Sequence, residues 1–309
     1  MDLLSDILDS LSLQGQFYFR TCFNSPWSIG VPNYASAIRF HYAMQGQCWV
    51  RAGEEAPIHL RQGDLILVPA GAAHVISDTP ERKPVGLERV MEDNDYSGGP
   101  LFVVGRGCEN AATQLMCGHF TFAEGSDHPL LRSLPSLIHV SASMRSSTFW
   151  LDEALRLMAR QMADDNPGSI AVVRRMSEII FIETVRSSAS QSQQLAGLME
   201  ALSDTRISRA IQAMHRDVAM HWTVEALASE AAMSRSRFAA RFQELVGCGP
   251  LTYLAEWRLQ KACALLREGR ISVQEVAGRI GYQSPAAFTR AFTNMFGESP
   301  SAYRDKLAA

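Results

Sequence analysis

Residues 273–297 read "VQEVAGRIGYQSPAAFTRAFTNMFG", and a related stretch, "VEALASEAAMSRSRFAARFQELVG", occupies residues 224–247. Apolar residues spaced by three and four predict a short helix, a turn and a longer helix in each stretch. The matching pairs, 49 or 50 residues apart, are Ala228 and Ala277, Phe238 and Phe288, and Phe242 and Phe292. This internal repeat predicts an all-α C-terminal domain with two helix-turn-helix units.

Helix-capping residues support these boundaries. Ser272 stands three residues before Glu275, which is the spacing of a capping box. Ser284 is followed by Pro285, the pattern of an N-cap and a first helical position. Thr223 and Ser234 hold the equivalent positions in the first copy.

The second helix of each copy divides by face, with phenylalanines on one side and small residues with arginine on the other. Small side chains let a helix approach the base edges of DNA, and arginine can pair with guanine or contact phosphate. This pattern favours a helix that enters the major groove, although a helical hairpin without a nucleic acid partner stays open. A long helix predicted over residues 250–269 would hold both units in fixed relation, so that they reach grooves roughly 34 Å apart.

The segment 204–309 strongly resembles the DNA-binding domain of the AraC/XylS family of bacterial transcription regulators. The resemblance rests on "WTVEALASEAAMSRSRFAARFQELVGCGPLTYLAEWRLQKACALL" and "VQEVAGRIGYQSPAAFTRAFTNMFGESPSAYR". It implies double-stranded DNA and RNA polymerase as partners, and activation of transcription. By position it implies groove contacts at Ser236, Ala239, Ala240, Pro285, Ala286, Ala287 and Arg290. Alanine stands where polar base readers often lie, so we expect Arg235, Arg237 and Arg241 to supply compensating contacts.

The charge distribution agrees with this assignment. Residues 204–309 contain 14 basic and 10 acidic residues, whereas residues 1–203 contain 15 basic and 22 acidic residues, which indicates that one end meets a polyanion. The N-terminal decapeptide "MDLLSDILDS" has no basic residue, and no apolar run approaches the ~20 residues that span a membrane. We therefore expect a cytoplasmic protein without a membrane partner, with its six cysteines reduced.

The N-terminal part has a different pattern. Between residues 15 and 125, short runs of β-branched and aromatic residues are separated by Gly, Pro, Asn and Asp, which predicts a sandwich or barrel. From residue 148 the period is helical. The helix predicted over 169–186 is apolar over a wide arc, so we expect it to be buried, either in an intrachain bundle or in a homodimer.

These patterns predict an α+β multidomain chain. The expected segments are a β-barrel sensor domain (1–145), a helical coupling or dimerisation segment (146–190), a linker (191–203) and the DNA-binding domain (204–309).

The stretch "GDLILVPAGAAH" at residues 63–74 has the spacing G-x5-P-x-G-x2-H and resembles the second cupin motif. The whole N-terminal segment is similar to the cupin-type sensor found in some members of the family above. In cupin enzymes the motif histidine, here His74, binds a metal. The first cupin motif is absent, because Arg39 stands at its glutamate position and no histidine pair precedes it. We therefore expect no enzyme; a metal-dependent cupin enzyme fused to a DNA-binding module is the alternative.

Three roles are open for the polar residues of the barrel. They could be hydrogen-bonded structural residues. Because side chains two residues apart share a strand face, a zinc-like metal could instead be bound by His41, His74, Cys117 and His119. A metal-free pocket could bind a small polar or anionic effector through Arg39, His41, Trp49 and His74, with Phe40, Phe102 or Phe120 on its apolar walls. In the last case the barrel would sense a small molecule and control the DNA-binding domain.

Overall fold

The structure is a computed structural model of the 309-residue chain, and it describes residues 2–34, 37–105, 107–108, 111–123, 126–142, 149–163, 166–269 and 271–308. The chain divides into two compact units. The sheet unit comprises Leu13–Phe122 and Leu134–Gln191, and the helical unit comprises Met1–Ser12, Ala123–Ser133 and Ser192–Ala309. The predicted sensor boundary of 1–145 is therefore wrong at two places, because two of its segments pack within the helical unit.

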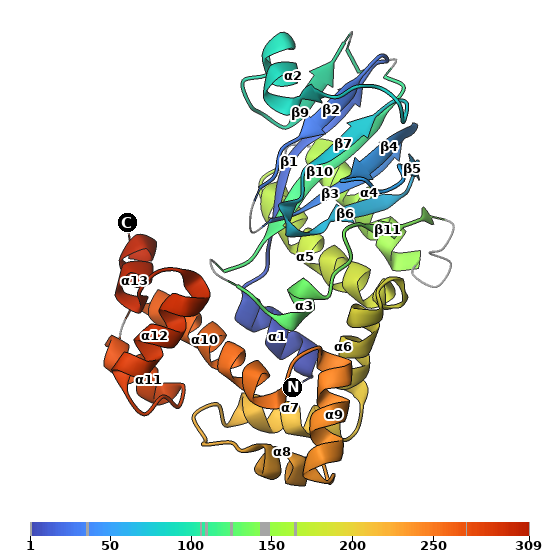
Figure 1. Cartoon of the computed structure of the whole chain (residues 1–309). Coiled ribbons are helices and arrows are strands. Elements are labelled where there is room, and N and C mark those ends of the chain that lie inside the picture. Colours follow the sequence, from blue (N-terminus) through green and yellow to red (C-terminus); the bar gives the residue numbers. More distant parts are fainter. Residues whose placement is uncertain are drawn as a thin grey trace. The chain divides into compact units, whose positions relative to one another are not determined.

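The sheet unit contains two sheets that form a cupin-like arrangement without closing into a continuous barrel (Figure 1). In spatial order the first sheet consists of β11 (Ile138–Val140), β6 (Leu65–Val68), β3 (Ala37–Gln45), β10 (Gln114–Thr121), β1 (Gln14–Phe23) and β9 (Leu101–Val104). The second consists of β5 (Ile58–Arg61), β4 (Gln47–Ala52), β7 (His74–Ser77), β2 (Ser28–Val31) and β8 (Val85–Gly86), followed along the chain by α2 (Leu87–Asp93).

The core of this unit lies between the inner faces of the two sheets. On β4, Cys48 and Val50 point inward and are fully buried, whereas the alternating Trp49 stays partly exposed. Val68 on β6 and Leu115 on β10 complete the same apolar cluster from the opposite sheet. On β4 the period of two thus produces one buried face. Strands β3, β6 and β10 are buried on both faces over most of their length.

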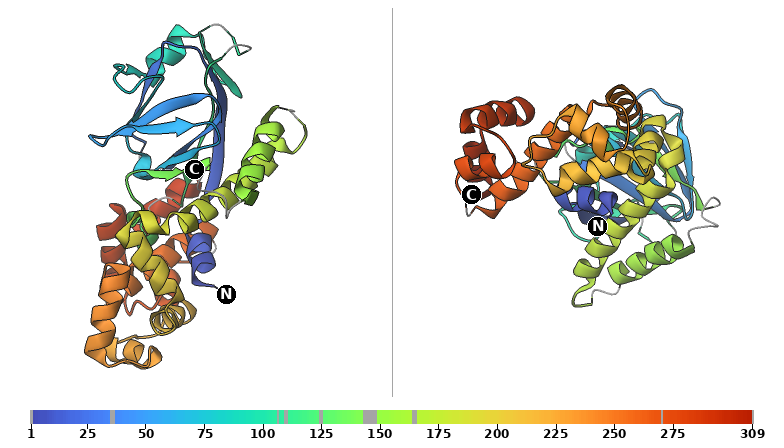
Figure 2. Two further views of the ribbon diagram at one scale, coloured as in Figure 1. Left: turned by 90° about the vertical axis from the view of Figure 1, so that its right-hand side faces the viewer. Right: turned by 90° about the horizontal axis from the view of Figure 1, so that it is seen from below.

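A helical hairpin belongs to the same unit. Helices α4 (Phe149–Ala163) and α5 (Ser169–Ser187) pack against each other (Figure 2, left), and Phe181 of α5 contacts Phe120 on the outer face of β10, with ring centroids 5.0 Å apart. The predicted burial of α5 holds for only part of its apolar arc, because Ile170 is 87% exposed and Ile179 is 50% exposed.

The cysteines differ from the sequence-based expectation. Cys22 on β1 forms a disulfide with Cys108, and their Cα atoms are 5.2 Å apart. The remaining cysteines, Cys48, Cys117, Cys248 and Cys263, are free thiols. A separation of 86 residues leaves no motif in the sequence, so only the fold brings this pair together.

The helical unit contains α1 (Leu3–Leu11), α3 (Pro129–Arg132), α6 (Gln193–Ser203), α7 (Ile207–Arg216), α8 (Val224–Glu230), α9 (Arg235–Val246), α10 (Pro250–Glu268), α11 (Val273–Arg279), α12 (Pro285–Phe296) and α13 (Pro300–Ala308) (Figure 1). The predicted linker over 191–203 is wrong, because α6 fills most of it and buries Leu195, Leu198 and Ala201. The polar stretch before α6 masks this helical spacing in the sequence. No helix in the described part of the chain has the length and apolarity needed to cross a membrane.

The two predicted repeats form matching helix-turn-helix units, α8–α9 and α11–α12. The Phe238–Phe242 and Phe288–Phe292 ring pairs have the same centroid distance, 5.6 Å. In the second turn Gly281 has φ +83°, and a Cβ there would lie 2.7 Å from the Ala219 carbonyl oxygen. Glycine is therefore required at this turn, whereas Ala232 occupies the equivalent left-handed position in the first unit with φ +51°.

Helix α10 links the two helix-turn-helix units. Its N-terminal half packs on the first unit, where Tyr253 contacts Phe242, and its C-terminal half contributes Cys263 and Leu266 to the cluster around Phe292. The sequence-based prediction of one long helix between the repeats is confirmed.

A buried polar network joins α1 and the segment before α3 to this domain. His215 on α7 lies between the Asp6 carboxylate, 2.6 Å from its Nδ1, and the Tyr253 hydroxyl, 2.8 Å from its Nε2. His128 lies 3.3 Å from the same hydroxyl, and Lys261 forms an ion pair with Asp6 at 3.2 Å. These contacts explain why α1, distant in sequence, belongs to the helical unit.

Candidate functional site

The second helices of the helix-turn-helix units present the predicted groove residues on their surface. On α9, Ser236, Arg237 and Ala240 are exposed and Ala239 is half-buried; on α12, Pro285, Ala286 and Arg290 are exposed and Ala287 is half-buried. All lie on faces opposite the buried phenylalanines. Among the described residues, neither Arg237 nor Arg290 has an ion-pair partner, so both guanidinium groups are free to meet DNA.

The other two predicted arginines are already paired. Arg241 forms ion pairs with Glu200, with Glu244 at 3.1 Å and with Asp204 at 4.0 Å. These contacts tie α9 to α6 and do not present the Arg241 guanidinium as the sequence suggested. Arg235 pairs with Glu225 at 2.5 Å, but both side chains are exposed, and such surface pairs exchange at little cost.

Three of the four predicted metal ligands form a hydrogen-bonded chain inside the sheet unit. His41 Nδ1 lies 3.2 Å from the Cys117 Sγ atom, and His41 Nε2 lies 2.8 Å from His74 Nε2. His74 Nδ1 lies 2.9 Å from the Ala72 carbonyl oxygen, which can only accept. His74 Nδ1–H therefore donates to Ala72, His41 Nε2–H donates to His74, and the Cys117 thiol donates to His41 Nδ1.

Burial keeps this chain uncharged. It lowers the pKa of His74 to about 4 and lowers the pKa of His41 well below its ordinary value, and in both cases the nearby charge of Arg39 acts in the same direction. Burial also raises the pKa of the Cys117 thiol far above its ordinary value. A neutral thiol is a poor nucleophile. At neutral pH these hydrogen bonds between Cys117, His41 and His74 therefore have a structural role.

The hydrogen-bonded side chains of Cys117, His41 and His74 do not surround a common metal position. Cys117 and His74 lie at opposite nitrogens of the His41 ring, so the three side chains cannot all face a single ion. His119 lies elsewhere and stacks on Tyr18, with centroids 4.6 Å apart. In the part of the chain that the structure describes, no group of three or more His, Cys, Asp or Glu side chains could hold a metal. The zinc-like site therefore stays a prediction, and the four predicted ligands do not converge on one position.

Arg39 and His119 form a second polar cluster with two tyrosines. The Arg39 guanidinium lies 4.0 Å from the Tyr34 ring centroid and 5.8 Å from that of Tyr18. Sequence reasoning missed both tyrosines. Tyr18 lies within an irregularity in the pairing of β1 with β10, between Phe17 and Phe19. This irregularity breaks the period of two that would have given the direction of the Tyr18 side chain.

Three aromatic residues predicted to line the pocket do not do so. Trp49 lies on the outer face of its sheet and stacks on His59, with centroids 4.4 Å apart. Phe40 contacts Phe120, which packs against α5 on the outer face of the first sheet. Of the four predicted aromatic residues, only Phe102 reaches the interior.

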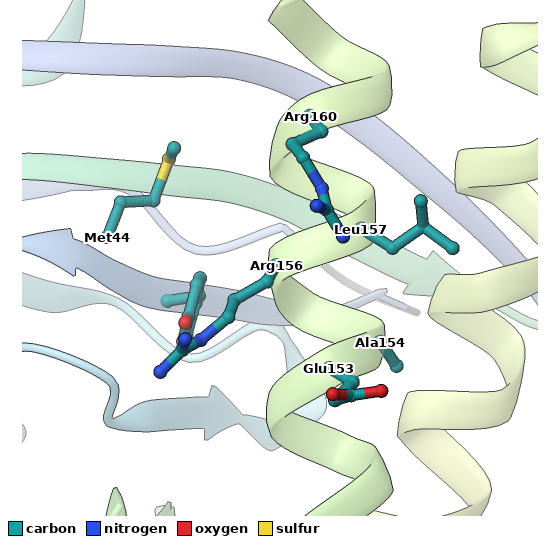
Figure 3. Close-up of a pocket in the computed structure, with 7 residues that line it drawn as sticks. Met44, Glu153, Ala154, Arg156, Leu157 and Arg160 are labelled. Atoms are coloured by element: carbon teal, nitrogen blue, oxygen red, sulfur yellow. The ribbon is translucent and has the colours of Figure 1, made fainter.

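Two hollows flank β3. An interior cavity of about 30 Å³ is lined by Tyr18, Thr21, Arg39, His41, Phe102 and Cys117, among others. On the outside, a larger hollow of about 580 Å³ lies between β3 and α4, lined by Tyr42, Met44, Glu153, Ala154, Arg156, Leu157 and Arg160 (Figure 3). None of the predicted effector residues lines the outer hollow, so the interior cavity is the candidate binding site.

Comparisons with known proteins agree with the two-part architecture. A family model described as "Cupin" matches residues 2–190, and one described as "Helix-turn-helix domain" matches residues 227–306. The DNA-binding domain of AdpA, solved in complex with a target DNA, is 38% identical; the match covers 33% of this chain and 91% of that one, with a TM-score of 0.32.

Relatives match the chain over its whole length. The HTH-type transcriptional regulator AlkR of Acinetobacter baylyi is 30% identical over 308 residues, 99% of this chain and all of that protein. A putative AraC-like transcription regulator of Streptomyces antibioticus is 29% identical over 98% of each chain. These relatives are regulators and not enzymes, as expected for this chain. The chain belongs to the AraC/XylS family of DNA-binding transcription regulators, with an N-terminal cupin domain and a C-terminal helix-turn-helix domain.

Proposed function

We propose that this protein is a transcription activator whose sheet unit binds a small-molecule signal that changes DNA binding by the helical unit. The observation that carries the proposal is the exposed face of α9 and α12, where small residues flank the unpaired guanidinium groups of Arg237 and Arg290. Helix α10 packs on both helix-turn-helix units and would hold their recognition helices, α9 and α12, in register with successive major grooves. Activation and contact with RNA polymerase are inferred from the family.

Signal transfer requires that the effector bind one arrangement of the protein better than another. Two covalent connections could carry it. Strands β1 and β10 are paired from Gln14 opposite Thr121, and each continues directly into a segment that belongs to the helical unit. Those segments are anchored on α7 and α10 through Asp6 and His128. A shift of the two strand ends would therefore act on the helices that position the first DNA-binding unit.

DNA binding is tested by mapping the bound sites on the source genome and measuring affinity for one mapped site and for a scrambled duplex. Arg290→Ala should weaken binding to the mapped site by about 1–3 kcal/mol and leave binding to the scrambled duplex nearly unchanged. Arg216→Ala is the control, because Arg216 is an exposed α7 residue paired with Asp217. Equal losses on both duplexes would identify Arg290 as a phosphate contact, and absence of specific sites would overturn the proposed function.

We also propose a homodimer through the exposed apolar residues of the helical hairpin. Val172 and Ile179 of α5 are 39% and 50% exposed, and their separation of seven residues places them on the same side of the helix, away from the buried Val173 and Ile180. A second copy of the same face would remove these side chains from water. Light scattering after gel filtration should give a dimer mass for the wild type and a monomer mass for Ile179→Asp. The control Met220→Asp, at an exposed position of the helical unit, should stay dimeric; a wild-type monomer would refute the dimer.

A further inference from the structure

Among the residues that the structure describes, Arg39 is a buried cation without a carboxylate partner. Its side chain lies within the sheet unit with the residue only 5% exposed, and its Nε atom is buried without a hydrogen-bond partner. Within the described ranges no carboxylate forms an ion pair with its guanidinium. Native proteins rarely bury a charge in this state, because the lost hydration is not replaced. Arg39 is therefore a candidate anion-binding residue.

The surroundings of Arg39 determine the shape of the anion. The Tyr34 ring, 4.0 Å away, and the Tyr18 ring, 5.8 Å away, both lie within cation–π distance of the guanidinium. A guanidinium that stacks on a ring by its face keeps the N–H groups at its edge for hydrogen bonds. A guanidinium edge matches the two oxygens of a planar carboxylate.

His119 supplies a second unsatisfied polar atom beside Arg39. The two residues are opposite each other in the pairing of β10 with β3. His119 is 8% exposed, and its Nδ1 atom is buried without a partner. With Nδ1 protonated, it could donate to the same anion. Burial lowers the pKa of His119, and the positive charge of Arg39 lowers it further, so an anion at this place would raise that pKa again.

The adjoining cavity limits the size of the ligand. Arg39 and Tyr18 line it together with the apolar side chains of Phe19 and Phe102. Its volume of about 30 Å³ holds roughly two or three water-sized groups, since one such group needs on the order of 10–15 Å³. A ligand that fits without repacking the core has a short apolar tail.

We propose that the sheet unit binds a short-chain monocarboxylate. The carboxylate pairs with the edge of the Arg39 guanidinium and accepts a hydrogen bond from His119, and the alkyl group enters the cavity beside Phe19 and Phe102. This inference rests on the proposed function, for which the carboxylate would be the small-molecule signal.

The test is isothermal titration calorimetry of the full chain with sodium propionate, at constant ionic strength maintained with chloride. Propionamide, which has the same shape without the charge, and sodium nitrate are parallel titrants. We expect propionate alone to bind, and Arg39→Gln to weaken its binding at least about tenfold. The matched control Arg51→Gln, at a partly exposed position of β4, should bind as the wild type does. Equal binding of propionamide, or unchanged binding by Arg39→Gln, would overturn the proposal; equal binding of nitrate would indicate an adventitious ion only.

Two further measurements separate a ligand site from a structural role. Without propionate, the melting temperature of Arg39→Gln should equal or exceed that of the wild type, because an unpaired buried charge has been removed; a large decrease would make Arg39 a structural residue and overturn the proposal. Titrations at pH 6 in two buffers with different ionisation enthalpies should show proton uptake on binding, reduced in His119→Gln. Absence of uptake would remove His119 from the site.

The affinity of Arg39→Gln for a mapped DNA site distinguishes this inference from the proposed function. If wild-type protein binds that site but not propionate, the carboxylate site is refuted and the regulator stands. If propionate binds at Arg39 without changing DNA affinity, the carboxylate site stands and its role as the signal is refuted.

Discussion

Acidification should destabilise the sheet unit through His74. In the folded protein His74 donates from Nδ1 to the Ala72 carbonyl and accepts at Nε2 from His41. A second proton on His74 would set two N–H donors against each other at 2.8 Å, and both side chains are buried. Burial accordingly lowers the pKa of His74 to about 4, from an ordinary value of 6.5.

The sign of the effect follows from proton binding. Between pH 6.5 and about 4 the unfolded chain carries a proton on His74 that the folded chain does not carry, so stability falls as the pH falls through this window. At pH 5 the loss from this one residue is about 2 kcal/mol, because each unit of pKa difference is worth about 1.4 kcal/mol. Above pH 6.5 the contribution is fully present.

Urea unfolding of the full chain at pH 7.5 and pH 5.0 measures this loss. Pulsed hydrogen exchange of peptides from β3 and β6 reports on the sheet unit separately from the helical unit. We expect His74→Gln to lose about 2 kcal/mol less than the wild type between the two pH values, whatever its absolute stability. His59→Gln, on the outer face of β5 beside Trp49, is the matched control. An unchanged pH dependence in His74→Gln would refute the reasoning.

Three other substitutions, one of them with a matched control, test the fold. Cys22→Ser opens a disulfide between residues 86 apart and should lower the free energy of unfolding of the sheet unit by about 4 kcal/mol in urea titrations; no difference from the wild type under oxidising conditions would exclude the Cys22–Cys108 bond. Ser284→Ala removes the hydroxyl that accepts from the backbone of α12 and should cost about 1 kcal/mol, whereas Ser234→Ala, whose hydroxyl makes no such bond, should cost less. Phe242→Ala should destabilise the first helix-turn-helix unit by about 3–5 kcal/mol, and a loss below 1 kcal/mol in thermal unfolding would contradict its place in the core.

The C-terminal domain could be predicted from the sequence because its signals are local. The spacing of the apolar residues around Phe238 and Phe288 identifies the buried face of each helix. N-cap residues such as Ser272 and Ser284 identify the first residues of α11 and α12. Duplication of the pattern revealed two units before any tertiary contact was known. The same local signals failed at α6, where the polar stretch before it indicated a linker.

The rest depends on contacts between residues distant in sequence. The alternation along a strand gives the relative directions of neighbouring side chains. Only the sheet register and the opposite sheet decide which face of the strand is inside. Trp49 and Phe120 therefore lie on outer faces, whereas Arg39 and His119 are buried together. By itself the sequence determined the family, the DNA-binding helices and the cupin-like character of the first domain. The tertiary structure alone decided the disulfide, the direction of the histidine relay and the uncompensated charge of Arg39, because each depends on strands that meet across many residues of chain.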